Sequence, residues 1–278
     1  MEPLLRVDDL SVRYSTPRGP IEAVRRLGFE LGREKLGLVG ESGSGKSTVG
    51  RAILRITPAS AKITAKTLAL GAEELLAASP ARMREIRGRH ISMVLQDPTY
   101  SLNPVVRVGA QVAESFLVHR KASRTEARER ALDMFAQVRI RNPKRVYDLY
   151  PHEVSGGMGQ RIMIAMMLIP EPEILIADEI TSALDVTVRN QVLAILDDLV
   201  TKRGLGLLFI SHDLNLVSTY CDRVLVMYSG RIVETLSASE LGRAKHAYTR
   251  GLLESMPRLK SPRERLPVLQ RDPAWLEG

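Results

Sequence analysis

The sequence contains no apolar run long enough to cross a membrane as a helix. A spanning helix needs about 18 consecutive apolar residues, whereas the longest runs here are short ones such as residues 162–169. The first residues show neither a basic segment followed by an apolar one nor a small-residue cleavage site, the pattern of a secretory signal. We therefore expect a chain that is not secreted and does not cross a bilayer.

Cysteine is almost absent, and no internal repeat or low-complexity tract is visible. The single cysteine, Cys221, excludes an internal disulfide and any metal or iron–sulfur site built from several thiolates. Sparse cysteine is typical of proteins from reducing compartments. The sequence therefore predicts a cytoplasmic location.

Hydrophobic residues make up 44% and charged residues 26% of the 278 positions, as in an ordinary folded protein. The net charge of +8 is compatible with nucleic acid, an anionic membrane face or a phosphate-bearing ligand as partner. Residues 119–145 hold nine of the cations and only three acids. A solvated basic helix is the reading that we favour for this stretch.

Hydrophobic periodicity predicts strands that alternate with helices. We expect strands at 4–14, 23–31, 36–39, 173–177 and 205–210, and helices from residue 46, at 72–89, 107–138, 155–169, 188–200 and near 248–253. The first two strands flank a proline-containing loop and form an antiparallel element. The later alternation favours an α/β fold with a mainly parallel sheet, interrupted by an α-helical insertion.

Residues 40–47 read G-E-S-G-S-G-K-S and satisfy the pattern G-x-x-x-x-G-K-S/T between a strand and a helix. Glycines let the backbone N–H groups turn towards phosphates, and the helix adds its positive N-terminal end. In such a loop Lys46 reaches the β- and γ-phosphates and Ser47 ligates Mg²⁺. The alternative, a flexible Gly/Ser loop, requires neither Lys46 nor Ser47 at this spacing.

Two carboxylates, Asp178 and Glu179, follow the apolar strand at 173–177. Next to a phosphate-binding loop (P-loop) such as residues 40–47, Asp178 would hold the metal's water shell. Glu179 would orient or deprotonate the water that attacks the γ-phosphate. An acidic helix N-terminus after a core strand is the alternative for these two residues taken alone. The P-loop earlier in the chain favours the catalytic interpretation.

Residues 155–161 read S-G-G-M-G-Q-R and begin a helix that stops before Pro170. A serine and two glycines at a helix start leave N–H groups free to bind an anion. A capped helix N-terminus without a ligand is the alternative.

Taken together, these motifs resemble those of ATP-binding subunits of ABC transporters, over roughly residues 4–255. Residues 40–47 and 173–179 are similar to the Walker A and B elements, 155–161 to the signature, 96–98 to the Q-loop, 182–185 to the D-loop, and 210–213 to the switch-histidine region. Longer phrases at 96–104, 150–158 and 246–253 resemble the oligopeptide, dipeptide and nickel import group.

The resemblance implies a set of site residues. The predicted catalytic residues are Glu179, His212 and Gln96, and the predicted metal ligands are Ser47, Gln96 and Asp178. The predicted nucleotide-binding residues are Tyr14, which would stack on adenine, Gly40, Ser42, Gly43, Ser44, Gly45, Lys46, Ser47, Thr48, Ser155, Gly156, Gly157, Gln160 and Asp185. The implied ligands are ATP and Mg²⁺.

The resemblance further implies a P-loop NTPase core at 1–95 and 162–235 with a β subdomain, an α-helical subdomain at 96–161 and a C-terminal extension at 236–278. Two cassettes would pair head to tail around two ATP molecules, and a sister chain is favoured over a second copy as the partner. The complex would include two transmembrane permease subunits and an extracytoplasmic solute-binding protein. The chain would lie on the cytoplasmic face of the inner membrane, and no nucleic acid is expected.

Two positions depart from the family pattern. Ile180 stands where the family has proline, and Gly159 stands where a bulkier polar residue is common. We expect slower hydrolysis at most, because Asp178 and Glu179 remain. Alternatives are a cytoplasmic ABC ATPase that acts on nucleic acid or ribosomes, motivated by the basic stretch, and a non-hydrolysing nucleotide sensor in a heterodimer. The cargo is not encoded in these motifs.

Overall fold

The computed structural model describes residues 2–95, 101–182, 184–255, 272 and 275. Contacts divide the chain into two compact units. The first unit contains residues 1–77 and 208–278, and the second contains residues 78–207. The domain boundaries inferred from the family resemblance stay a prediction.

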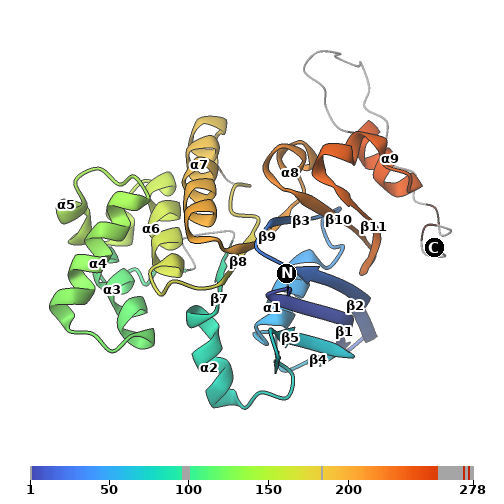
Figure 1. Ribbon diagram of the computed structural model, residues 1–278, viewed down its shortest axis with the longest axis horizontal. Coiled ribbons are helices and arrows are strands. Elements are labelled where there is room, and N and C mark those ends of the chain that lie inside the picture. The colour runs from blue at the N-terminus through green and yellow to red at the C-terminus, as the bar shows by residue number, and fades with distance from the viewer. Residues whose placement is uncertain (1, 96–100, 183, 256–271, 273–274, 276–278) are drawn as a thin grey trace. The chain divides into compact units, whose positions relative to one another are not determined.

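An antiparallel sheet begins the first unit (Figure 1). Strand β1 (Leu5–Thr16) pairs with β2 (Gly19–Leu31) from Leu5 opposite Leu31 to Thr16 opposite Gly19. Strands β4 (Ala61–Thr64) and β5 (Thr67–Leu70) also pair with β1, and the short β6 (Glu73–Glu74) pairs with β5. The antiparallel pairing of β1 with β2 confirms the predicted element, and alternate apolar side chains of the two strands are buried.

The other sheet strands of the first unit lie in the order β11, β10, β3, β9. Their bounds are β3 (Lys35–Val39), β9 (Gly206–Ser211), β10 (Arg223–Tyr228) and β11 (Arg231–Ser237). Strand β10 runs parallel to β3 and antiparallel to β11. The helices are α1 (Lys46–Ile53), α8 (Leu214–Tyr220) and α9 (Ala247–Glu254), with a 3₁₀ segment at Ala238–Arg243.

Cys221 follows α8 in the first unit and is buried. Burial, with a smaller contribution from Asp222, raises the pKa of the thiol from 9.0 to about 12. We expect a thiol reagent to label the folded protein at least 100-fold more slowly than the guanidinium-unfolded protein at pH 8, because the thiolate fraction falls about 1,000-fold over three pKa units. Labelling of the folded protein at the unfolded rate would show that this thiol is accessible.

The second unit contains the α-helical insertion and two parallel strands. Its helices are α2 (Pro80–Arg89), α3 (Val108–His119), α4 (Arg124–Gln137), α5 (Pro143–Tyr147), α6 (Gly156–Leu168) and α7 (Val186–Arg203), with a 3₁₀ turn at Pro151–Glu153. Helices α3, α4, α5 and α6 pack together (Figure 1). Strand β7 (Ile91–Val94) pairs in parallel with β8 (Ile174–Asp178), from Ile91 opposite Ile174 to Val94 opposite Ala177.

Two of the predicted helices are wrong in extent. Helix α2 begins at Pro80 rather than at residue 72, because Ser79 caps it by accepting a hydrogen bond from the Arg82 N–H at 3.2 Å. The predicted helix at 107–138 is two helices, since Ser123 caps α4 by accepting from the Glu126 N–H at 3.1 Å. The predicted helices at 155–169, 188–200 and 248–253 are confirmed to within a few residues.

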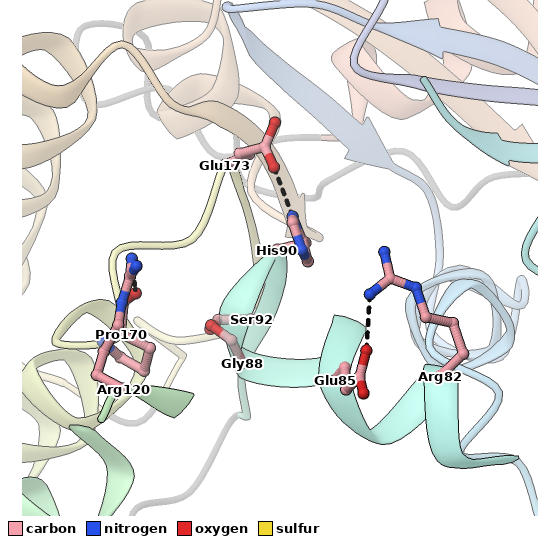
Figure 2. A network of polar contacts seen from close by, with 8 residues as sticks. All are labelled: Arg82, Glu85, Gly88, His90, Ser92, Arg120, Pro170 and Glu173. Carbon is pink, nitrogen blue, oxygen red and sulfur yellow. Dashed lines mark hydrogen bonds and ion pairs between the residues drawn. The ribbon is translucent and has the colours of Figure 1, made fainter. Parts of the chain in front are cut away.

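Polar contacts fix the start of β8 against β7 (Figure 2). The Nδ1 atom of His90 lies 2.6 Å from Oε1 of Glu173, and the backbone N–H of Glu173 donates to the His90 carbonyl at 2.9 Å. Arg120 donates to the Pro170 carbonyl at 3.1 Å before this strand. These contacts anchor the chain at the start of β8. The four apolar residues of this strand are fully buried, and the strand ends at Asp178.

The structure confirms the predicted α/β class with an antiparallel element and an α-helical insertion. In the described ranges, no helix is both long enough and apolar enough to span a bilayer. Across those same residues, no group of three or more His, Cys, Asp and Glu side chains forms a metal site.

Candidate functional site

The loop at residues 40–47 lies between β3 and α1 of the first unit, as predicted. Gly45 caps α1 with a φ of 104°, a left-handed conformation that favours glycine. A Cβ atom at this position would collide with the backbone oxygen of Ala23. The loop therefore requires glycine here, and it presents the N-terminus of α1 to its interior.

The side chain of Lys46 is 4% exposed and folds back under this loop. Its Nζ donates to the carbonyl oxygens of Gly40 and Glu41 at 2.9 and 2.8 Å. Phosphate binding would require the ammonium to turn at least one of its three N–H donors towards a phosphate oxygen.

Ser44 supplies a second sign that the loop is built for a ligand. Its side chain is 5% exposed, and its buried Oγ has no hydrogen-bond partner among the described residues. A buried hydroxyl without a partner is costly in a folded protein. A phosphate oxygen would satisfy it, so the residues of the loop fit the phosphate group.

Two further predicted residues, Tyr14 and His212, also belong to the first unit. Tyr14 is half-buried on β1, opposite Ile21 of β2. His212 is exposed directly after β9, before Asp213 caps α8 by accepting from the Leu216 N–H at 3.0 Å. The histidine is thus held at the end of a buried strand.

Asp178 and Glu179 lie at the end of β8 in the second unit. Asp178 is 3% exposed, whereas Glu179 is half-buried. Glu179 has a φ of 50°, an uncommon backbone conformation for a residue other than glycine. Its carbonyl accepts from the Ser182 hydroxyl at 3.0 Å, and Ile180 is 1% exposed. Such strain is frequent at functional sites.

The predicted anion site at the start of α6 is a capped helix N-terminus within a pocket. Ser155 caps α6 by accepting from the Met158 N–H at 3.4 Å. A Cβ at Gly157 would lie 2.6 Å from Cγ1 of Val188, so glycine permits the close approach of α6 to α7. Asp185 caps α7, since it accepts from the N–H groups of Thr187 and Val188 at 2.9 and 3.0 Å.

The pocket beside this helix start has a volume of about 570 Å³. Ser155, Gly156, Gly157 and Asp185 contribute to its lining. Three arginines, Arg139, Arg141 and Arg161, line it as well.

The pKa of Arg161 reflects the positive charge of this pocket. Burial lowers the pKa of its guanidinium, and the nearby charges of Arg139 and Arg141 lower it further. Arg139 is paired with Asp198 at 2.7 Å. An anion placed in the pocket would relieve the mutual repulsion of these cations.

Arg139 and Arg141 belong to the basic stretch at 119–145, and sequence reasoning did not assign them to a site. The rest of that stretch largely fits the solvated interpretation, because Arg124, Arg128 and Arg130 are exposed on α4. Proximity to residues 155–161 along the chain was the available signal.

The remaining predicted residues divide as follows. Gln160 is 1% exposed on α6, and its amide nitrogen has no hydrogen-bond partner among the described residues. Gly159 lies one residue earlier in the same helix. Gln96 and residue 183 of the predicted D-loop lie outside the described residues.

The donor chemistry of two other residues matches magnesium. Ser47 on α1 and Asp178 on β8 carry a hydroxyl and a carboxylate, and Mg²⁺ prefers such oxygen ligands. Ser47 belongs to the first unit and Asp178 to the second.

Comparison with known proteins gives concordant matches. The ABC transporter family matches residues 25–182. The "Probable peptide ABC transporter ATP-binding protein" of Sinorhizobium fredii is 47% identical over 273 residues, 96% of this chain and 81% of the relative. The oligopeptide transport ATP-binding protein OppD of Bacillus subtilis is 42% identical over 264 residues, 94% of this chain and 74% of OppD.

A solved structure is similar in fold. The protein cbiO1 of Clostridium perfringens, described as part of the ABC transporter complex cbiONQ, superposes with a TM-score of 0.70 at 26% identity. The match covers 87% of this chain and 92% of cbiO1.

Proposed function

The chain belongs to the ABC transporter family, and from that premise we propose that it is the ATP-hydrolysing subunit of an importer for peptides or for nickel and other metal chelates. The main observation in support of ATP hydrolysis is the loop at 40–47, where Lys46 is buried and the buried Ser44 hydroxyl has no hydrogen-bond partner among the described residues. The peptide cargo follows from the names of the relatives at 42–47% identity.

The chemistry is hydrolysis of the terminal phosphoanhydride. A water oxygen attacks the γ-phosphorus while Glu179 accepts the water proton, and the bond between that phosphorus and the leaving ADP oxygen breaks. Lys46 and the loop N–H groups stabilise the charge on the phosphate oxygens. The Ser47 hydroxyl and the Asp178 carboxylate would be ligands of a bound Mg²⁺, which would neutralise part of the phosphate charge.

The remaining predicted residues act around this reaction. Tyr14 stacks on adenine, Gln96 and His212 contact the γ-phosphate region, and Asp185 links the two nucleotide sites of a cassette pair. Each ATP lies between the 40–47 loop of one cassette and the 155–161 helix of its partner. The arginine-lined pocket beside Ser155 supports this arrangement, because its positive charge suits an anion delivered by another chain.

Arg141 offers a test of that pocket. We expect Arg141→Glu to lower ATP turnover of the assembled complex about tenfold and to leave ATP binding by the isolated chain unchanged, because a charge-assisted contact to the partner's nucleotide is lost. The matched control is Arg145→Glu, which reverses an exposed charge on α5 outside the pocket lining. Equal turnover for the two variants would contradict a role for the pocket in trans.

The proposed complex contains two transmembrane permeases, a second ATP-binding subunit that is a sister chain, and an extracytoplasmic solute-binding protein. The chain would lie peripherally on the cytoplasmic face of the inner membrane. Its α-helical subdomain at 96–161 would contact the permeases. Opening of the cassette pair after hydrolysis would then drive alternating access in the permeases.

Uptake by the native host tests this function. The host would carry Glu179→Gln in place of its own copy, and uptake of labelled dipeptide, labelled oligopeptide and radioactive nickel would be compared with the parent. Loss of peptide uptake supports a peptide importer, and loss of nickel uptake alone supports the metal-chelate branch. Unchanged uptake of all three would contradict the proposal.

The nucleic-acid alternative is not supported. Three cations of the 119–145 stretch are paired with acids of the same unit: Arg120 with Glu171, Arg128 with Asp148, and Arg139 with Asp198. The relatives at 42–47% identity are named for peptide transport. The basic stretch therefore gives no reason to prefer a nucleic-acid partner.

A further inference from the structure

A tyrosine near the C-terminus contacts the backbone of the phosphate loop. Tyr248 on α9 is fully buried, and its hydroxyl oxygen accepts a hydrogen bond from the Glu41 N–H at 3.0 Å. The two residues lie 207 positions apart in the chain and within the first unit. Tyr248 belongs to the phrase at 246–253, for which the motif analysis gave no function.

The bonded N–H belongs to the peptide group that joins Gly40 to Glu41. The carbonyl of that same group, the Gly40 oxygen, accepts from Lys46 Nζ at 2.9 Å. A peptide group is planar, so its N–H and C=O point in opposite directions. Tyr248 and Lys46 therefore hold this group from its two sides, and rotation of the peptide would break both contacts.

The element that carries Tyr248 is anchored to β11. The carboxylate of Glu234 accepts from the N–H of Lys245 at 2.6 Å and from that of His246 at 3.3 Å. The Nδ1 atom of His246 in turn accepts from the Tyr248 N–H at 3.2 Å and caps α9. The start of the helix is thereby fixed, and the tyrosine is fixed with it.

Aromatic neighbours restrain the ring as well. The centroid of Tyr248 lies 4.5 Å from that of Tyr228 and 5.6 Å from that of Trp275. Trp275 also contacts Tyr228 edge-on at 5.5 Å. Because aromatic contacts of this kind stabilise specific geometries, the hydroxyl has little freedom to leave the Glu41 N–H.

We infer that Tyr248 is a positioning residue of the nucleotide site, which preorganises the Gly40–Glu41 peptide so that Lys46 and the loop are set for the β- and γ-phosphates. The inference rests on the proposed function of the loop at 40–47. Through Tyr248, α9 becomes a structural part of the nucleotide site rather than an appendage. Trp275, the only tryptophan in the sequence, contacts the ring of Tyr248, whose hydroxyl is hydrogen-bonded to the loop.

Tyr248→Phe tests this role, because it removes the hydroxyl and keeps the ring contacts. We expect the Kd for MgATP to rise about fivefold, the change that corresponds to one hydrogen bond. The midpoint of thermal unfolding without nucleotide should fall by only about 2–4 °C, because one backbone donor loses its partner. The matched control is Tyr228→Phe, which removes a hydroxyl from the neighbouring ring and should change the Kd by less than twofold. Trp275 fluorescence should respond to MgATP in the parent and respond less in Tyr248→Phe.

The outcomes separate the two proposals. If the parent chain fails to bind MgATP, the proposed function of the loop is wrong. If the parent binds and Tyr248→Phe binds equally well, Tyr248 has no positioning role. An equal rise in Kd for Tyr248→Phe and Tyr228→Phe would also overturn the inference, because the effect would then come from the aromatic cluster and not from the contact with Glu41.

Discussion

Glu179→Gln is expected to lower ATP turnover of the assembled transporter by at least about 100-fold while MgATP binding is preserved. Glutamine has the size of glutamate and keeps its hydrogen-bonding capacity, but it cannot accept the proton of the attacking water. A positioned general base contributes roughly 10²- to 10⁴-fold to a rate. The half-buried carboxylate directly after β8 is the group that we propose for this task.

The same variant should accumulate the closed, ATP-bound cassette pair, since binding continues without turnover. Steady-state phosphate release and retention of labelled ATP on the isolated complex measure the two effects. Glu171→Gln is the matched control, because it neutralises an exposed carboxylate shortly before β8, 3.8 Å from Arg120. Parental turnover in Glu179→Gln would remove Glu179 from the catalytic role.

Lys46→Ala is expected to weaken MgATP binding by about 100-fold or more and to abolish measurable hydrolysis. The ammonium is buried beneath the loop, and its charged hydrogen bonds to phosphate oxygens are of the strong kind. The substitution also removes the donor that orders the carbonyls of Gly40 and Glu41. The loop would therefore lose both its shape and its charge.

Equilibrium binding of a fluorescent ATP analogue checks this expectation. Lys62→Ala serves as the control, since it removes an exposed lysine from β4 of the same unit. Circular dichroism and thermal unfolding show whether each variant is folded. Parental affinity in folded Lys46→Ala would mean that the loop at 40–47 is not the phosphate site.

Local sequence patterns predicted much of this fold, and they failed where tertiary contacts override local preference. The segment at 72–79 is rich in good helix formers, yet Glu73 and Glu74 pair with β5 as a short strand, and Leu75 is fully buried. Helix propensity is a weak signal that such pairing readily outweighs. The hairpin of β10 and β11 was missed, although Ser229 and Gly230 form a turn signal between two strand-like runs.

In the candidate site, residues within contiguous motifs could be predicted from the sequence, whereas residues that only folding brings together could not. Residues 40–47 and 173–179 form contiguous motifs, so their spacing alone predicted a loop and a strand end. Arg139 and Arg141 reach the pocket through a turn in which Arg139 and Asn142 have φ values of 57° and 53°. No periodicity encodes such a turn. Likewise, no spacing rule connects Tyr248 with Glu41, because only the folded chain brings them together.

We propose that this chain drives a membrane importer. Affinity capture of the tagged Glu179→Gln chain from its native host, with ATP and Mg²⁺ in a mild detergent, tests it most directly, because the variant should hold its partners in the closed state. Mass spectrometry is predicted to identify two integral membrane permeases together with a second ATP-binding subunit. Recovery of ribosomal or DNA-bound proteins and of no permease would contradict the claim.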